Sequence, residues 1–281
     1  MKKKKFIENL PIVIFGFLFV IGLAIMFYPA ISSIVNNLKY QSMIASYDEM
    51  VGEESTSNQI LEDAKKYNDQ LTTTVLSDAF TNPNQNSSSL YLKTLNIDGS
   101  GVMGYIEIPK IDIKIPIYHG TGSESLQNGV GHLEGSSLPI GGVGTHAILS
   151  AHRGLPTSRL FTDLDQLRKG DEFYIYILNE IHAYQIDQVL TVEPHETESL
   201  MIDDNHDYIT LVTCTPYAVN THRLLVRGKR VEYKENQENN KKKAMYMSLS
   251  DICLSVGIWT VDLVLIIAII ITRKTYKKLK S

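Results

Sequence analysis

Two long apolar runs bracket the sequence, and the first lies close to its start. Residues 10–28 contain no charged side chain and follow the basic segment Met1–Lys5. This run approaches the roughly 20 residues that span a bilayer, and it exceeds the roughly 7–15 residues of a signal-peptide core. The residues after it also make a poor cleavage site. We therefore predict an uncleaved N-terminal membrane span within residues 1–30, with its basic end in the cytoplasm.

The second apolar run covers residues 252–272 and is followed by a basic tail, residues 273–281. Asp262 lies in its middle, where a carboxylate costs roughly 2.5–3.5 kcal/mol on insertion scales, but the surrounding Ile, Leu and Val side chains can offset this cost. A buried helix of a soluble domain is the alternative. Cationic flanks mark the cytoplasmic side. We therefore expect both termini in the cytoplasm and the segment between the two runs outside the cell membrane. Lys241–Lys243 departs from this bias.

Between residues 31 and 74, apolar residues recur at intervals of three and four, which predicts amphipathic helix. The pattern is interrupted near Val51 and Gly52. We interpret this region as a helical stalk that leaves the membrane and packs against the main domain. Residues 75–100 follow as a loop, because their first part is rich in Thr, Asn and Ser.

From residue 101 to residue 233 the pattern changes to an alternation of apolar and polar positions, which is typical of β-strands. Many short strands at close spacing favour a closed or nearly closed β-barrel. Ser158–Arg168 is the one short helical pattern within this region, and residues 234–251 are predicted to be a linker to the second apolar run. The expected strands are residues 105–109, 111–117, 147–149, 173–178, 183–189, 208–212 and 224–226.

Composition and charge narrow the function classes. The 281 residues carry a net charge of −4 and no basic block outside the two ends, so nucleic acid is not an expected partner. No phosphate-binding glycine motif and no paired Cys or His at zinc-ligand spacing is present. We expect no cofactor and no metal. A calcium site made of carboxylates scattered along the sequence would not produce such a pattern. The two cysteines, Cys214 and Cys253, allow no disulfide framework.

Cys214 lies in the exported part and is the first candidate for chemistry. It ends an apolar strand, Pro216 begins a turn, and a second strand starts near Arg223. Neighbouring antiparallel strands bring the end of one close to the start of the next, which places a permanent cation near the thiol. A guanidinium favours the thiolate over the thiol, and it can stabilise the oxyanion that forms when a thiolate attacks a carbonyl. A buried, inert cysteine is the alternative.

A thiol nucleophile usually works with a histidine as acid and base. His152 stands out among the eight histidines, because the apolar strand Ala147–Leu149 leads into a glycine-bearing loop that contains it. Functional side chains are often placed on such loops. His222 is the rival, since it is adjacent to Arg223. With ordinary pKa values near 8.5 and 6.5, a thiolate–imidazolium pair would be populated on the order of 1% at neutral pH.

These residues carry a resemblance to a known family. Thr210–Cys214 matches the sortase signature Thr-Leu-x-Thr-Cys, and its continuation, Thr215–Gly228, is similar to the pilin-polymerising class C branch. Ser150–Pro156 and Leu160–Leu164 resemble the histidine loop of that branch. The resemblance covers about residues 101–231. It implies a mainly β fold, an eight-stranded sortase-type β-barrel, here with the N-terminal helical stalk and two transmembrane helices.

The resemblance also implies a cysteine transpeptidase of Gram-positive bacteria. Cys214 would attack the Thr–Gly bond of an LPXTG-type sorting signal, and His152 would protonate the leaving amine and later accept a proton from the incoming one. Arg223 would stabilise the substrate or the oxyanion. A lysine amine of another pilin would resolve the thioacyl enzyme, so pilin subunits and other proteins with LPXTG-type signals are the expected partners. Thr213 would contribute to substrate positioning, or it is only a strand residue.

Three other functions stay open. A housekeeping sortase would join surface proteins to a cell-wall precursor and would differ in the amine that it accepts. A cysteine peptidase would hydrolyse its substrate, and added amine would not divert the product. An inactive barrel would act as a membrane-anchored binding scaffold, and its Cys214 would form no acyl adduct.

Class C members often carry a lid, an Asp-Pro-aromatic tripeptide in the segment before the barrel. This chain has Asp78, Ala79 and Phe80 in that region, so alanine stands where the proline would be. Asp78 would pair with Arg223, and Phe80 would cover Cys214. The missing proline leaves the loop less rigid, and a plain polar loop is the alternative.

The lid hypothesis makes a direct prediction for thiol reactivity. If Phe80 covers Cys214, then Phe80→Ala exposes the sulfur and alkylation by iodoacetamide becomes faster. The rate is measured by mass spectrometry of the peptide that contains Cys214. An unchanged rate would argue against a lid.

Overall fold

The computed structural model describes residues 2–51, 54–71, 78–80 and 88–234. The predicted second membrane span at 252–272 lies outside the described residues. So do Cys253, nearly all of the 234–251 linker and the basic tail at 273–281.

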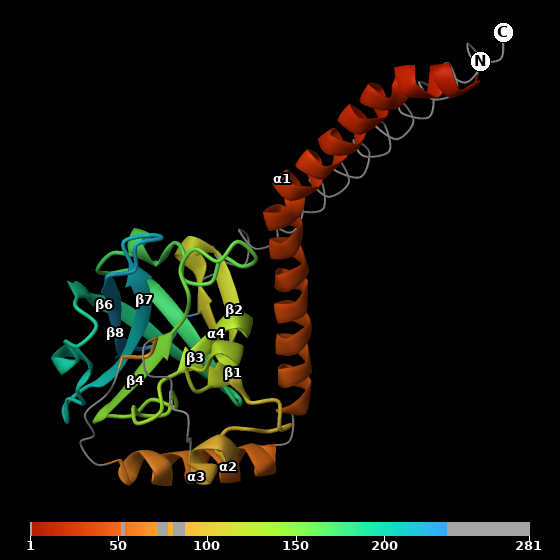
Figure 1. Ribbon diagram of the computed structural model, residues 1–281. Coiled ribbons are helices and arrows are strands. Elements are labelled where there is room, and N and C mark those ends of the chain that lie inside the picture. The colour runs from red at the N-terminus through yellow and green to blue at the C-terminus, as the bar shows by residue number, and fades with distance from the viewer. Residues whose placement is uncertain (1, 52–53, 72–77, 81–87, 235–281) are drawn as a thin grey trace. The chain divides into compact units, whose positions relative to one another are not determined.

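Within the described residues, eight β-strands close into a barrel (Figure 1). Their order around the barrel is β1-β2-β3-β4-β7-β8-β6-β5, and β1 pairs with β5 to complete the ring. The predicted closed barrel is therefore confirmed. The strands are β1 Val102–Ile108, β2 Ile113–His119, β3 Val130–His132, β4 Thr145–Ser150, β5 Glu172–Ile177, β6 Glu180–Val192, β7 Asp207–Thr215 and β8 His222–Val231.

Two of the strand pairs are parallel, and they determine which strand ends meet. β2 pairs in parallel with β3, and β4 pairs in parallel with β7. The carboxyl ends of parallel neighbours lie at the same edge of a sheet, so the residues that follow β4 emerge beside the end of β7. Alternation did not reveal β3, since it has only three residues and the middle one is Gly131.

The predicted helix over Ser158–Arg168 was wrong. This segment is a loop with a single 3₁₀ turn, Leu164–Gln166, and Leu160 has a φ of 37° that an α-helix does not allow. Leu160, Phe161, Leu164 and Leu167 are nonetheless all buried. Their helix-like spacing therefore reflects four core contacts made by an irregular loop.

Two long helices precede the barrel, α1 Lys2–Met50 and α2 Glu54–Asp69, and the break between them falls at the predicted interruption. The carboxyl-terminal part of α1 packs on β1 and β2 through buried Tyr40, Ile44 and Tyr47. On α2, the amide of Asn68 exchanges two hydrogen bonds with the backbone of Leu138. These contacts agree with a stalk that packs against the main domain.

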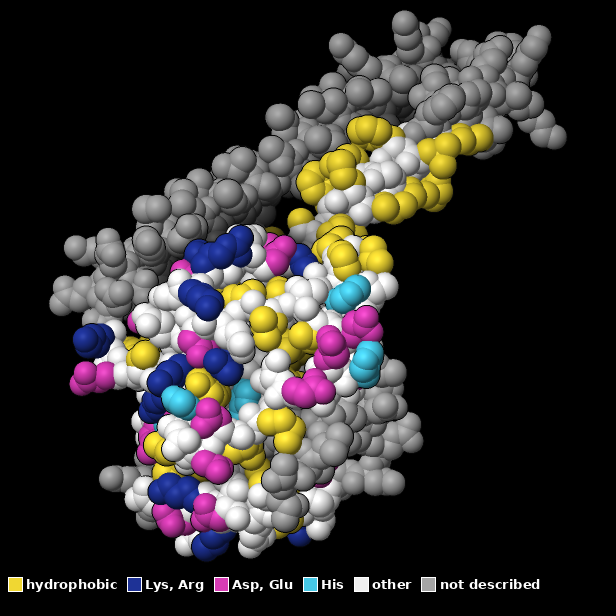
Figure 2. Space-filling model, turned by 90° about the vertical axis from the view of Figure 1, so that its left-hand side faces the viewer, with side chains coloured by type: hydrophobic (Ala, Val, Ile, Leu, Met, Phe, Trp, Pro, Cys, Tyr) yellow, Lys and Arg dark blue, Asp and Glu magenta, His cyan; other side chains and the backbone are white. Residues whose placement is uncertain are grey.

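The amino-terminal part of α1 has a different surface. Its apolar side chains, among them Phe17, Leu18 and Phe19, are exposed. Figure 2 shows hydrophobic side chains gathered along this part of the helix, whereas basic and acidic side chains are intermixed on the barrel. Gly16–Met50 is, among the described residues, the one helical segment long and apolar enough to cross a membrane.

Shorter helical elements connect the strands. α3 Ser89–Lys93 lies within the segment predicted as a loop, and the Ser88 hydroxyl accepts a hydrogen bond from the backbone of Tyr91 at its start. Tyr91 is fully buried, so this helix inserts a large side chain into the core. The remaining elements are α4 Ser123–Asn128 and the 3₁₀ turns η1 Pro109–Ile111, η2 Leu164–Gln166 and η3 Glu198–Leu200.

The barrel interior is filled by apolar and aromatic side chains, and Gly228 on β8 makes room for two of them. A Cβ at Gly228 would lie 2.5 Å from the Phe173 ring and 2.9 Å from Tyr184. These two rings stack with their centroids 5.5 Å apart. Gly228, the last residue of the motif after Cys214, therefore leaves room for two stacked rings.

Tyr47 provides a test of how firmly α1 is joined to the barrel. Its buried hydroxyl donates to the Met103 carbonyl at 2.8 Å and accepts from the Leu178 amide at 2.8 Å. Tyr47→Phe leaves both buried backbone groups without this partner, and each such loss costs about 1–3 kcal/mol. We expect denaturant unfolding of the full chain in detergent micelles to show a loss of about 2 kcal/mol or more. Tyr217→Phe, at an exposed position, is the control and should stay within about 0.5 kcal/mol.

Candidate active site

Cys214 and Arg223 face each other across two antiparallel strands. β7 and β8 pair with Cys214 opposite Arg223 and Thr215 opposite His222. Cys214 is 9% exposed, and Arg223 is also buried. The structure thus brings the thiol and the guanidinium together as predicted, because a short connection returns the chain beside the strand that it has just left.

His152 reaches the same place from the other side of β7. β4 pairs in parallel with β7, and the register ends with Ser150 opposite Val212. The next residue continues it, since the Ala151 amide donates to the Val212 carbonyl at 3.1 Å. His152 is the next residue, and continuation of the same offset would set it opposite Cys214. The rival, His222, precedes Arg223 on β8. Neighbouring strand residues point to opposite faces, so His222 lies on the other face from Arg223.

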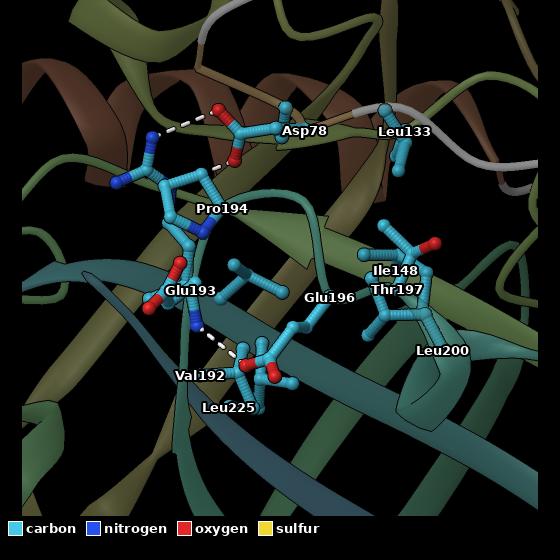
Figure 3. A pocket seen from close by; sticks show the side chains of 13 residues that line it. Asp78, Leu133, Ile148, Val192, Glu193, Pro194, Glu196, Thr197, Leu200 and Leu225 are labelled. Carbon is cyan, nitrogen blue, oxygen red and sulfur yellow. Dashed lines mark hydrogen bonds and ion pairs between the residues drawn. The ribbon is translucent and has the colours of Figure 1, made fainter. Parts of the chain in front are cut away.

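Arg223, opposite Cys214 on the neighbouring strand, lines an apolar groove on the barrel. Residues two apart on a strand share a face, so Val212 lies on the face of Cys214, Leu225 on that of Arg223, and Ile148 on that of Ser150. Ile148, Val212 and Leu225 line one narrow cavity of about 20 Å³, which is room for about one water molecule. Leu133 and Leu200 also line it, and Figure 3 shows the Asp78 carboxylate at its rim.

The tripeptide Asp78–Phe80 lies over this groove. The Asp78 carboxylate accepts two hydrogen bonds from Arg223, from Nε at 2.7 Å and from Nη2 at 2.8 Å (Figure 3). Ala79 is buried against the apolar groove residues. The Phe80 ring contacts two of the candidate catalytic residues, with its centroid 5.8 Å from the His152 ring and 5.2 Å from the guanidinium carbon of Arg223. The predicted partner of Asp78 is thus found.

The surroundings favour the uncharged forms of thiol and imidazole. Burial raises the pKa of Cys214; the nearby Arg223 charge opposes this rise, and the Asp78 charge adds to it. Burial also lowers the pKa of the half-buried His152. Both shifts disfavour a thiolate–imidazolium pair while Asp78 neutralises Arg223. The hydrogen bond to Asp78 in turn raises the pKa of Arg223, which stays charged.

Two further residues connect the His152 loop to β7. Thr213 is fully buried, and its hydroxyl donates to the Ala151 carbonyl at 2.8 Å. Arg153 donates to the Thr215 hydroxyl at 3.1 Å and to the Asp165 carboxylate at 2.6 Å. The family resemblance suggested Thr213 for substrate positioning but not Arg153. The only signal for Arg153 was its position beside a candidate catalytic histidine.

The same loop is also held by α1. The Asn36 side chain donates to the Thr157 carbonyl at 2.7 Å, and the Tyr40 and Ser158 hydroxyls are hydrogen-bonded at 3.0 Å in a buried position. Helix α1, whose amino-terminal part carries exposed apolar residues, therefore contacts Thr157 and Ser158, five and six residues after His152.

The fold is a closed β-barrel, and at the end of β7 it places a thiol beside a guanidinium and the His152 loop. This arrangement is that of an enzyme with a cysteine nucleophile. Residues 106–231 match the family model described as the sortase domain. The chain is 50% identical to the solved structure of sortase C1 from Streptococcus agalactiae. The alignment covers 69% of this chain and all of that one, with a TM-score of 0.62. The chain is also 44% identical to sortase C of Streptococcus pneumoniae. That alignment covers 69% of this chain and 99% of the other, with a TM-score of 0.63.

The chain therefore belongs to the sortase family, and these structural neighbours are class C sortases. A curated relative, sortase A of Streptococcus agalactiae serotype III, is 33% identical over 131 residues, which is 45% of this chain. The chain covers 52% of that relative's length.

The contact between Asp78 and Arg223 makes a prediction about the thiol. Asp78→Asn keeps the shape of the side chain and removes the charge that helps to raise the pKa of Cys214. That pKa should fall, so more thiolate is present at pH 7. Because one pKa unit corresponds to tenfold in thiolate fraction, we expect iodoacetamide to react about three- to tenfold faster. The midpoint of the pH–alkylation curve should also move to lower pH.

Asp163→Asn is the matched control, because Asp163 pairs with Arg159 on the loop surface. It should leave both the rate and the midpoint unchanged. Equal alkylation rates for the wild-type chain and Asp78→Asn would contradict an electrostatic effect of Asp78 on the sulfur.

Proposed function

We propose that this chain is a class C sortase, a membrane-anchored transpeptidase that cleaves LPXTG-type sorting signals and joins them to a lysine amine of a pilin. The observation that carries the proposal is the placement of Cys214 between Arg223 on β8 and the His152 loop after β4. The identity to solved class C sortases over almost their whole length supports the choice of branch.

In the first half-reaction, the Cys214 sulfur attacks the threonine carbonyl carbon of the sorting signal. The carbonyl oxygen becomes an oxyanion, and the guanidinium of Arg223, the residue opposite Cys214, stabilises it in this proposal. As the Thr–Gly bond breaks, the His152 imidazolium donates its proton to the leaving glycine amine. The products are a thioester on Cys214 and a free amino-terminal glycine.

In the second half-reaction, the lysine amine of another pilin attacks the thioester carbon. Neutral His152 accepts a proton from this amine, the carbon–sulfur bond breaks, and an isopeptide bond forms. The imidazolium and the thiolate are thereby restored. The same imidazole acts as acid and then as base, which is the usual role of histidine beside a thiol nucleophile.

The tripeptide Asp78–Phe80 acts as a lid in this proposal. Asp78 occupies the guanidinium that the oxyanion needs, and Ala79 fills the apolar groove. The leucine and proline of a sorting signal would bind in that groove, against Ile148, Val212 and Leu225. The lid must therefore leave before the substrate binds. Its departure also removes the Asp78 charge that raises the pKa of Cys214.

We further propose that two membrane spans anchor the barrel outside the cell membrane. The first span is the exposed apolar part of α1, within Gly16–Met50. The second is the apolar run at 252–272, whose basic flank places both termini in the cytoplasm. A reagent that modifies thiols but does not cross membranes should reach Cys214 in intact cells.

The central experiment follows the thioacyl enzyme. Incubated with an LPXTG-type peptide, the full chain should gain the mass of the peptide up to the threonine on Cys214, and Cys214→Ala should gain nothing. Addition of a lysine-containing pilin peptide should then convert the adduct into a branched product at the expense of hydrolysis.

Each rival has its own outcome in this experiment. A housekeeping sortase would prefer a cell-wall precursor amine to the pilin lysine. A cysteine peptidase would release hydrolysed peptide regardless of added amine. Absence of any adduct on Cys214, with Asp78→Asn as well as with the wild-type chain, would favour the inactive scaffold.

A further inference from the structure

The end of β7 and the His152 loop are joined on both sides of the candidate catalytic pair. Before the pair, the Thr213 hydroxyl donates to the Ala151 carbonyl at 2.8 Å. After the pair, Arg153 donates to the Thr215 hydroxyl at 3.1 Å. Both bonds join residues 62 positions apart in the sequence, which is also the offset of the β4–β7 ladder.

These bonds begin where the regular ladder stops. β4 ends at Ser150, and the Ala151 amide makes the last backbone bond to β7. Beyond it the loop turns away, and the Phe161 amide donates to the His152 carbonyl at 3.1 Å. The side chains of Thr213 and Arg153 therefore replace the backbone bonds that would otherwise hold residues 151–153 in register.

The side chains of Thr213 and Arg153 both have little exposed surface, and both have donor groups that reach across to the neighbouring segment. Thr213 has no exposed surface, and its hydroxyl lies on the opposite face of β7 from Cys214. The Arg153 side chain is only 9% exposed and bridges two acceptors, Thr215 on β7 and Asp165 later in the loop. A planar guanidinium can hold two acceptors in fixed directions, which an ammonium group does less well.

We propose that Thr213 and Arg153 are positioning residues that set the place of the His152 imidazole relative to the Cys214 sulfur. This inference rests on the proposed transpeptidation. It assigns Thr213 a role through His152 and not through contact with the substrate. Misplacement of a catalytic group by about 1 Å can cost about a hundredfold in rate, so the loss of either bond has a large effect on catalysis.

The test uses matched variants of the full chain. Thr213→Val keeps the shape and removes the donor, whereas Thr213→Ser keeps the donor. Arg153→Gln removes the bridge. The control is Arg159→Gln, because Arg159 is an exposed arginine on the same loop whose ion pair is with Asp163 of that loop. For each variant we would measure kcat and KM for transpeptidation, the iodoacetamide rate and the thermal unfolding midpoint.

We expect Thr213→Val and Arg153→Gln to lower kcat at least about tenfold with KM within about twofold. Thr213→Ser should recover most of the rate, and Arg159→Gln should match the wild-type chain. The iodoacetamide rate should stay within about twofold, because Arg223 and Asp78 are unchanged. Unaltered kcat in both variants would overturn the proposal, as would a rise in KM alone for Thr213→Val. If Thr213→Val does not fold, Arg153→Gln decides.

A second readout does not depend on activity. The NMR signals of the His152 ring, recorded in chains with labelled histidine, should shift in Thr213→Val and Arg153→Gln but not in Arg159→Gln. Unshifted signals in both variants would refute the positioning role even if the wild-type chain forms no thioacyl adduct. An absent adduct would refute the proposed transpeptidation separately.

Discussion

Hydrogen bonding along both edges of β7 is the constraint on which the candidate site depends. One edge pairs antiparallel with β8 and sets Arg223 opposite Cys214; the other pairs in parallel with β4 and brings the His152 loop alongside. Side chains alternate between the two faces of a strand, so a slip of one residue in either ladder would turn its partner to the wrong face. The apolar groove residues Val212 and Leu225 share this register, which makes the groove and the chemistry parts of one arrangement.

The charges at this site are arranged to keep the sulfur uncharged while the tripeptide is in place. Burial raises the pKa of the Cys214 thiol; the charge of Arg223 opposes this rise, but Asp78 neutralises Arg223 through two hydrogen bonds. A buried carboxylate–guanidinium pair repays its desolvation only when its geometry is good, and this pair has both bonds below 3 Å. In the proposed reaction the oxyanion of the substrate would need the same guanidinium, so the Asp78–Arg223 pair would have to separate before the substrate binds.

The barrel was predicted from the alternation of apolar and polar residues, whereas the neighbours of Cys214 were predicted from short sequence patterns around it. The pairing of Cys214 with Arg223 is local, because a turn of a few residues joins the two strands. The approach of His152 depends on a parallel pairing across about sixty residues, so His152 was singled out by its place on a loop after an apolar strand and by the motif, and its pairing with β7 was not predicted. The bonds of Thr213 and Arg153 depend on that same pairing, which is why Arg153 was missed. Buried residues at helical spacing misled the prediction over 158–168, since burial alone can imitate a helix.

A fixed charge placed on the Cys214 sulfur should raise the pKa of His152 if the two groups are neighbours. In a Cys253→Ser background, iodoacetate leaves a carboxylate on Cys214, whereas iodoacetamide leaves a neutral amide of similar size. A charge within about 4–6 Å shifts the pKa of a neighbour by about 1–3 units. NMR titration should therefore give a higher His152 pKa in the carboxymethylated chain than in the amide-modified chain. Equal pKa values in the two adducts would mean that sulfur and imidazole are not neighbours, and the account would be wrong.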